Sequence, residues 1–416
     1  MAASVSINCR RRDNCRLCAS RRLELVLSLT PTPPANAFVR DAQDQEAFPL
    51  DLFFCLDCRH LQLLDIVDPV FLFKNYVYVS GTSPVFVKHF QEYADDLVRR
   101  FEPATGDLIV DVGSNDGTLL GFFKKSGLRV LGVDPAKDTA RRASEAGIET
   151  IQEFFTPALA KSIRDKYGAA FALTANNVFA HADDLEGMVA GVRELISPDG
   201  IFAFEVSYLL DVYTKTLFDT IYHEHLAYHS VKPLRSFLQA NGMQMIEALR
   251  VDSHGGSLRC LAQCAGGPRR AGSSVEELIR LEESLGLDRP ETFARFTADI
   301  EKRKTELSAL LSDFKGKGMR IAGFGAPAKA TTLMYHFGLG PALIDFIVDD
   351  SPWKQGLLSP GLHIPILSSS AIYERRPDCL VIMAWNFADS IRAKHKAYAE
   401  SGGRFIVPLP NPVVYD

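Results

Sequence analysis

The 416-residue sequence lacks a long apolar run, a strong excess of one charge and any short-period repeat. No apolar stretch approaches the ~20 residues that a membrane-spanning helix needs, and "MAASVSINCRRRDNC" at the start lacks the apolar core of a secretory signal. A formal net charge of -5 gives no overall attraction to nucleic acid or to anionic membranes. We therefore expect a cytoplasmic protein without nucleic-acid or membrane partners.

Cysteine is scarce, with eight residues, but four of them form two pairs of equal spacing, "CRLC" and "CLDC". In a reducing compartment such pairs indicate a metal site before disulfides. Each pair places two thiolates on one tight turn, and two turns supply the four soft ligands of tetrahedral zinc. Because four thiolates close the coordination shell, the predicted zinc is structural. The predicted ligands are Cys15, Cys18, Cys55 and Cys58.

The rest of the chain has the pattern of an α/β protein. With 47% hydrophobic residues, the chain is long enough for two or three domains with their own cores. The stretch "DLIVDVGSNDGTLLGFFKKSGLRVLGVDP" predicts a strand, a glycine turn, a helix and a second, parallel strand. "MRIAGFGAPAKATTLMYHFG" repeats that pattern. We predict a small metal-binding module over 1–70, a Rossmann-like domain over 71–245 and a second one over 246–416.

The first glycine turn indicates a nucleoside-containing cofactor. In "DVGSNDG", Gly113 and Gly117 let the backbone turn sharply beside a helix N-terminus, while Asp134 ends the next strand where it can bind two ribose hydroxyls. The glycine order is not G-x-G-x-x-G, which disfavours a dinucleotide. Asp111 and the polar turn suit an amino-acid tail better than a pyrophosphate, so the pattern favours S-adenosylmethionine. A turn that binds no ligand stays open as the alternative.

The segment "YHEHLAYHS", residues 222–230, places three histidines, a glutamate and two tyrosines within nine residues. His225 and His229 are four residues apart, but Ala227 departs from the H-E-x-x-H zinc motif and no third ligand is evident. The segment therefore suits proton transfer better than metal binding.

Several of these motifs occur together in one known family. The two cysteine pairs, "YVYVSGTSPVFVKHF", "VDVGSNDGTLL", "YHEHLAYHS", "SHGGSLR", "GFGAPAKATTL", "VDDSPWKQG" and "AWNF" resemble, in this order, the sugar C-methyltransferases that act on nucleotide-linked 4-keto-6-deoxyhexoses. The similarity covers essentially the whole chain. It implies a zinc-binding domain, an S-adenosylmethionine domain and a C-terminal domain that helps bind the nucleotide sugar. The implied reaction is methylation of C3, next to the C4 ketone, through an enolate.

That chemistry needs a base and a group that stabilises the developing oxyanion. The resemblance implies His225 as base, Tyr222 near the keto oxygen and Glu224 holding the sugar or orienting the imidazole, with Tyr76 and His181 also facing the site. Which of His225, Tyr222 and His181 takes the proton stays open. The residues expected to contact the cofactor are Asp111, Gly113, Asn115, Asp116, Gly117, Asp134, Phe154 and Asn176. Those expected to contact the substrate are His254, Arg259, Gly325, Lys329, Asp350, Lys354 and Asn386.

Two other functions remain open at this stage. "GFGAPA" fits a nicotinamide fingerprint, which would make the protein a nucleotide-sugar oxidoreductase, although Pro327 and Lys329 suit a nest for a diphosphate better. A nonenzymatic zinc-ribbon scaffold is the second alternative. Arg259 suits either a phosphate contact or a solvent-exposed strand edge. The sequence permits a monomer and does not specify the nucleotide or the sugar.

Overall fold

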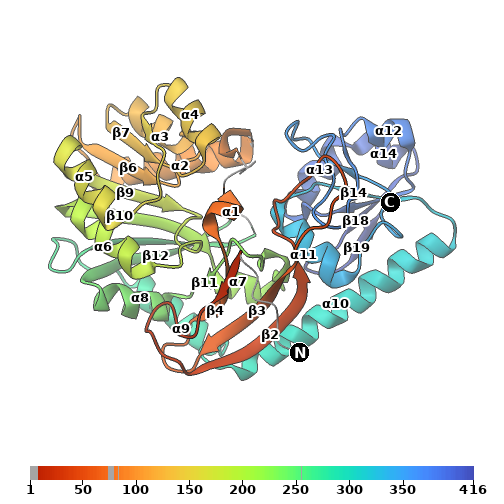
Figure 1. Cartoon of the computed structure of the whole chain (residues 1–416), viewed down its shortest axis with the longest axis horizontal. Helices are drawn as coiled ribbons and strands as arrows, with labels where there is room; N and C mark the ends of the chain where they lie inside the picture. The colour runs from red at the N-terminus through yellow and green to blue at the C-terminus, as the bar shows by residue number, and fades with distance from the viewer. Residues whose placement is uncertain (1–7, 74–78, 83, 254) are drawn as a thin grey trace.

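The computed structural model describes residues 8–73, 79–82, 84–253 and 255–416. Two α/β lobes stand side by side, and the N-terminal strands together with a long helix, α10, join them along one side (Figure 1). Strands of the described ranges form four sheets, of two, four, seven and six strands. None of the helices in these ranges is long and apolar enough to cross a membrane.

The N-terminal module contains two antiparallel sheets. Its strands are β1 (Cys9–Arg11), β2 (Leu23–Thr32), β3 (Phe48–Cys55), β4 (Leu61–Leu63) and β5 (Asp65–Val67). β1 pairs with β5, while β2, β3 and β4 form a sheet whose edge strand, β11 (Ala227–Tyr228), comes from much later in the chain. Alternate residues of β3, among them Leu50, Leu52 and Phe54, are fully buried, as expected for a half-buried strand.

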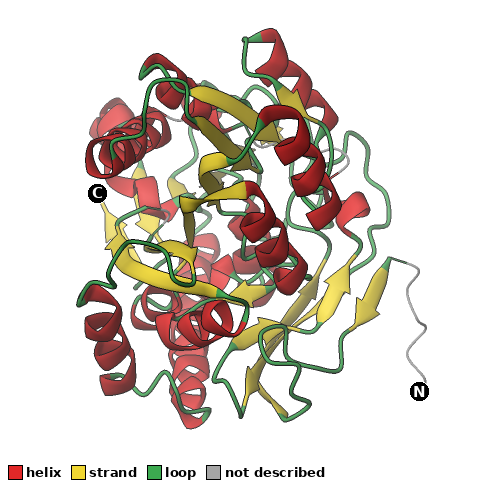
Figure 2. Ribbon diagram, turned by 90° about the vertical axis from the view of Figure 1, so that its left-hand side faces the viewer, coloured by secondary structure: helices red, strands yellow, loops and turns green. Residues whose placement is uncertain are grey.

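The central domain is built on a mainly parallel sheet with the order β12-β13-β10-β9-β6-β7-β8. Its strands are β6 (Leu108–Val112), β7 (Arg129–Val133), β8 (Thr150–Ile151), β9 (Ala170–Asn176), β10 (Ile196–Ser207), β12 (Met243–Val251) and β13 (Ser257–Cys264). Helices cover both faces (Figure 2). One face holds α2 (Pro84–Phe101), α3 (Thr118–Lys125) and α4 (Lys137–Glu145), and the other holds α5 (Pro157–Tyr167), α6 (Leu185–Leu195), α8 (Val231–Ala240) and α9 (Ser274–Ser284).

The central sheet extends past the domain boundary that the sequence places at residue 245. β12 begins at Met243, and β13 pairs antiparallel with both β12 and β10, with Glu205 opposite Arg259. Both strands of this hairpin, Met243–Val251 and Ser257–Cys264, therefore pair within the central sheet. A hairpin strand can pair on either side of a boundary, and local sequence does not specify which sheet it joins.

The C-terminal domain has a second mainly parallel sheet, with the order β16-β15-β14-β17-β18-β19. Its strands are β14 (Ile321–Phe324), β15 (Ile347–Val348), β16 (Ile366–Leu367), β17 (Cys379–Ile382), β18 (Arg404–Val407) and β19 (Val413–Tyr415). Its helices are α11 (Ala328–Phe337), α12 (Ala371–Arg375), α13 (Ala388–Lys394) and α14 (Lys396–Glu400). The two parallel sheets confirm the predicted α/β class.

The three parts share a core. Helix α10 (Glu291–Gly316) has 26 residues and is about 39 Å long at about 1.5 Å per residue. Phe293 and Ile300 of this helix pack in one apolar cluster with Phe54 of β3 and Ile321 of β14. The remaining elements are short helices: α1 (Pro69–Phe73), η1 (Ser80–Thr82), α7 (Leu209–Thr214), η2 (Phe218–Thr220) and η3 (Trp385–Phe387).

Candidate active site

A cavity of about 630 Å³ receives side chains from the N-terminal module, the central domain and the C-terminal domain. It lies at the carboxyl ends of β6, β7 and β9, the edge where open α/β sheets bind ligands. Asn36 enters it from the N-terminal module, and Lys329 and Lys354 enter it from the C-terminal domain. The volume falls within the range of small-molecule sites, about 300–1,000 Å³.

The glycine turn between β6 and α3 forms one wall. Gly113 has a φ of +71°, and a Cβ there would lie 2.2 Å from Cγ2 of Val178, so both the backbone and the space require glycine. Two residues later in the turn, Asn115 donates its backbone N–H to Oδ2 of Asp134 over 2.8 Å. The carboxylate that ends β7 thus holds the turn in place.

The groups around this turn fit S-adenosylmethionine. Asp134 lines the cavity, and its burial raises the pKa of the carboxyl although two backbone N–H groups stabilise the anion. Burial also raises the pKa of Asp111 to about 7, while the Thr174 hydroxyl donates to it over 2.6 Å. Phe154, 44% exposed, adds an aromatic surface to the same wall. A strand-end carboxylate can bind the ribose hydroxyls, and an aromatic side chain in the same cavity can stack on adenine.

The expected cofactor residues do not all reach the cavity. Those that line it are Asp111, Gly113, Asn115, Asp134, Phe154 and Asn176. Asp116 instead accepts from the backbone N–H and the hydroxyl of Thr118 at the start of α3, and from the backbone N–H of Gly81. Gly117 has a φ of +75° and packs against Ile148. These two residues shape the turn without lining the cavity.

His225 has a defined tautomer. Its Nδ1 lies 2.8 Å from the carbonyl oxygen of Thr220, and because a carbonyl only accepts, Nδ1 carries the proton. Nε2 is then the acceptor, and the Tyr222 hydroxyl donates to it over 2.9 Å. Burial lowers the pKa of His225 to about 4. The imidazole is therefore neutral at neutral pH and carries a lone pair on Nε2.

Two further predicted residues stand beside this pair. The ring of His181, in the loop after β9, lies with its centroid 5.0 Å from that of His225, and burial together with His225 lowers the pKa of His181 well below its usual value. Glu224 accepts a hydrogen bond of 2.7 Å from the side chain of Asn36. His181, Tyr222, Glu224 and His225 all line the cavity. Tyr76 and His254 lie outside the described residues.

His229, four residues after His225, does not line the cavity with His181, Tyr222, Glu224 and His225. His229 is fully buried and stacks on His60, with ring centroids 5.3 Å apart. Within the described residues, the side chains that cluster with the spacing of metal ligands are the four cysteines, and neither His225 nor His229 belongs to that cluster.

The four predicted zinc ligands converge. Their sulfur atoms all lie within 4.8 Å of one another, with Cys15 and Cys58 3.5 Å apart and Cys18 and Cys55 3.6 Å apart. Zinc bound tetrahedrally at about 2.3 Å from each sulfur would separate the sulfurs by about 3.8 Å. The donor set and its spacing therefore fit one zinc ion, and the four ligands lie outside the lining of the cavity.

Two lysines of the C-terminal domain form a cationic end of the cavity. The Lys329 ammonium, near the start of α11, lies 3.4 Å from the ring centroid of Trp385 and has no hydrogen-bond partner among the described residues. Burial lowers its pKa to about 8, although Asp219 opposes the shift. Lys354 donates to the carbonyl of Ala326 over 2.8 Å, and burial lowers its pKa also. Asn386 lines the same end.

Three predicted substrate residues do not line the cavity. Arg259 is 8% exposed and pairs with Glu205 over 3.0 Å while its guanidinium stacks on Tyr93, so it stabilises the interior of the central domain and is neither a phosphate contact nor a solvated edge. Asp350 forms an ion pair of 2.7 Å with Lys394. Gly325 supports the turn after β14, where a Cβ would lie 2.6 Å from that of Ala384.

Other lining residues were not predicted from the sequence. Arg10, Asn36 and Asp183 reach the cavity from the N-terminal module and from the loop after β9. The basic run "CRRRDNCRLC" was a visible indication for Arg10, and "HADD" was one for Asp183. No local pattern distinguishes Asn36, because its role depends on the packing of two distant segments.

The fold and the site define a methyltransferase that uses S-adenosylmethionine and carries a structural zinc site. Residues 15–73 match a putative zinc binding domain, 86–248 a methyltransferase domain and 252–410 a C-methyltransferase C-terminal domain. The chain is 35% identical over 405 residues to the C-methyltransferase NovU of Streptomyces niveus, a match that covers 97% of this chain and 96% of that protein. The chain therefore belongs to the C-methyltransferase family, as its motifs indicate.

More distant relatives match shorter parts of the chain. A mitochondrial ubiquinone biosynthesis O-methyltransferase of Bos taurus is 25% identical over 159 residues, which cover 35% of this chain and 43% of that protein. A solved S-adenosylmethionine-dependent methyltransferase from Anabaena variabilis is 15% identical, with a TM-score of 0.35 over 42% of this chain and 84% of that one.

Proposed function

We propose that the protein methylates C3 of a nucleotide-linked 4-keto-6-deoxyhexose. The observation that supports this most is that one cavity joins the glycine turn, the Tyr222–His225 pair and the two lysines. An enzyme that joins two substrates must present both to one enclosed volume, where holding them in orientation removes much of the entropic barrier.

His225 is the proposed base. Its Nδ1–H is held by the Thr220 carbonyl, so Nε2 receives the proton from C3 and the electrons of the C–H bond form the enolate. The same carbonyl then stabilises the imidazolium through Nδ1–H. When bound, S-adenosylmethionine supplies an electrophilic methyl group to the carbon that has lost its proton.

Tyr222 is the proposed oxyanion donor. Its hydroxyl hydrogen-bonds to His225 Nε2, so it stands beside the position that a C3–H must occupy to be removed. Once that C–H faces Nε2, the hydroxyl donates to the neighbouring C4 oxygen and stabilises the charge of the enolate. We also propose that Glu224, fixed by Asn36, binds a sugar hydroxyl and that His181 closes the wall behind His225.

The lysine end is the proposed site of the diphosphate. A buried ammonium without a hydrogen-bonding partner is costly unless a ligand satisfies it, and an anion does this best. Lys329 meets that description within the described part of the chain, and the N-terminus of α11 beside it adds backbone N–H donors. Lys354 supplies a second charge, and Asn386 a polar contact, to the same group.

A turnover experiment tests the proposal. Purified protein is incubated with S-adenosylmethionine and a panel of nucleotide-linked 4-keto-6-deoxyhexoses in deuterated water, and the sugars are analysed by mass spectrometry. We expect one added methyl group with the native chain and none with His225→Gln. Oxidation or reduction of a sugar with nicotinamide, without methyl gain, would overturn the proposal in favour of an oxidoreductase.

A further inference from the structure

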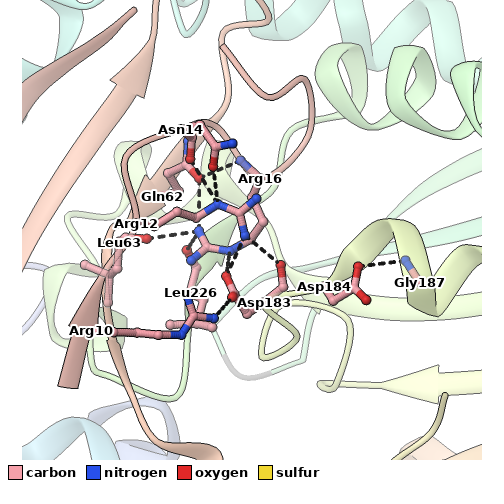
Figure 3. A network of polar contacts seen from close by, with 10 residues as sticks. All are labelled: Arg10, Arg12, Asn14, Arg16, Gln62, Leu63, Asp183, Asp184, Gly187 and Leu226. Carbon is pink, nitrogen blue, oxygen red and sulfur yellow. Dashed lines mark hydrogen bonds and ion pairs between the residues drawn. The ribbon is translucent and has the colours of Figure 1, made fainter. Parts of the chain in front are cut away.

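Arg16 lies between two predicted zinc ligands, Cys15 and Cys18, and its side chain bridges the N-terminal module and the central domain. The side chain is fully buried, and burial lowers the pKa of the guanidinium to about 10 although Asp183 opposes the shift. Its Nη1 shares its hydrogens among Gln62 Oε1 at 3.0 Å, Leu63 O at 2.9 Å and Leu226 O at 3.0 Å, and its Nε donates to Asp183 Oδ1 at 3.2 Å (Figure 3). Nη2 is buried and has no hydrogen-bond partner among the described residues.

Two of these acceptors stand next to the histidines of the active site. Leu226 directly follows His225, and Asp183 comes two residues after His181. Figure 3 shows Arg10 and Arg12 converging with Arg16 on Asp183. Although burial raises the pKa of Asp183, the arginines, Arg16 first among them, bring it below its usual value.

Backbone hydrogen bonds join the same three segments. Leu63 N–H donates to Leu226 O over 3.0 Å, and Leu226 N–H donates to Ala180 O over 2.9 Å. Strand β4, the loop that carries His181 and the segment that carries His225 therefore meet at Leu226. The side chain of Arg16 hydrogen-bonds to all three of them.

We propose that Arg16 is a positioning residue, which transmits the order of the zinc site to His181 and His225 and sets their relative placement. The zinc ligands on either side fix the turn that carries Arg16. Its guanidinium then bonds through two separate nitrogens, Nη1 to Leu63 and Leu226 and Nε to Asp183, which the single nitrogen of a lysine ammonium does not reproduce. A displacement of about 1 Å at reacting groups costs a large factor in rate. Zinc thus contributes to turnover through geometry, although it lies outside the cavity.

The test compares Arg16→Lys with Arg21→Lys in the full chain. Arg21 belongs to the same module, but its side chain is 80% exposed and pairs with Asp13 at the surface. The readouts are zinc content, Tm, the Kd of S-adenosylmethionine, kcat and KM for the sugar, and ¹⁵N NMR of the histidine side chains. The His225 signal is assigned from its loss in His225→Gln.

For Arg16→Lys we expect full zinc content, an unchanged Kd for S-adenosylmethionine, a kcat at least about tenfold lower with KM changed less than about threefold, and shifted ¹⁵N signals of His225. Arg21→Lys should match the native chain in every readout. A zinc-loaded Arg16→Lys with native kcat and native histidine signals would overturn the inference.

A second variant and a second treatment keep the test independent of folding and of the proposed substrate. If Arg16→Lys does not fold, Asp183→Asn, at the other end of the contact, should give the same loss of kcat and the same ¹⁵N shift, and native values there overturn the inference. Zinc removal from the native chain by a chelator should also shift the His225 signal. Of these readouts, only kcat depends on the proposed catalytic role of the histidines. If none of the sugars is methylated but the ¹⁵N signal of His225 still shifts in Arg16→Lys, the result contradicts the proposed function and leaves the positioning role of Arg16 supported.

Discussion

The hydroxyl of Tyr222 and Nε2 of His225 form one unit in the resting site. Replacing Tyr222 with Phe removes the donor while keeping the ring, so we expect kcat to fall about a hundredfold with little change in the Kd of S-adenosylmethionine. Rapid-quench methyl transfer and calorimetric titration measure the two quantities. Native kcat in Tyr222→Phe would assign oxyanion stabilisation to another residue.

The low pKa of His225 predicts the acid limb of the reaction. In the proposed reaction the lone pair on Nε2 takes the C3 proton, so protonation of Nε2 would block that step, and burial lowers the pKa of His225 to about 4. As the pH falls, kcat should therefore stay constant through about pH 6.5, the usual pKa of histidine, and should decline only as the pH approaches about 4. Initial rates after brief pH jumps measure this. A decline of kcat centred at about pH 6.5 would contradict the proposal that the base is a buried His225 that stays neutral down to about pH 4.

Residue roles could be predicted where the chemistry is local and not where it depends on a partner. The cysteine spacing predicted ligands that do converge, and the histidine segment predicted residues that line the cavity. Arg259 was misassigned because its partner, Glu205, lies opposite it only in the register of β10 and β13. Asn36 and Arg16 were missed for the same reason.

At the scale of elements, Gly113, in the turn between β6 and α3, can be compared with Gly121, within α3. Gly113→Ala would place Cβ 2.2 Å from Val178 Cγ2 at a φ of +71°, so the turn must move. We expect the Kd of S-adenosylmethionine to rise at least about tenfold and Tm to fall. Calorimetric titration and thermal unfolding measure these effects.

Gly121→Ala is the matched control, since Gly121 lies within α3 and its Cβ would meet no atom within 4 Å. That change should leave the Kd unchanged and raise the stability by up to about 1 kcal/mol, the difference in helix propensity. Equal loss of binding in both variants would show that α3, and not the turn, governs the cofactor site.

Elements with strong local patterns were predictable, and pairing between distant elements was not. Both strand-turn-helix units follow from apolar runs that end in glycine turns. The pairing of the β12–β13 hairpin with β10 could not be predicted because antiparallel strands can join either neighbouring sheet. β11 has two residues, too few for any periodic pattern.

At the scale of the whole molecule, buried neutral histidines predict sensitivity to acid. Burial lowers the pKa of His223 and His225 to about 4 and of His229 to about 3, each below the usual value of about 6.5. The unfolded chain then binds more protons than the folded one below pH about 6.5. The stability is complete above that pH and falls as pH drops toward about 4, by about 1.4 kcal/mol for each unit and each histidine.

Urea unfolding at several pH values measures this decline. His229→Phe removes one of these groups from a fully buried position outside the cavity, so its stability should fall less steeply between pH about 6.5 and about 4 than that of the native chain. An unchanged slope would mean that His229 takes up its proton in the folded state.

The position of β11 limits how genes of this kind can recombine. Ala227 and Tyr228 complete the sheet of the N-terminal module, although they follow the proposed base His225 by only two and three residues. A gene that lost the first 70 codons would strip this segment of its partner strand and of Arg16 together. If the proposed base is correct, the module and the segment that carries His225 depend on each other, and recombination that separates them should yield inactive descendants.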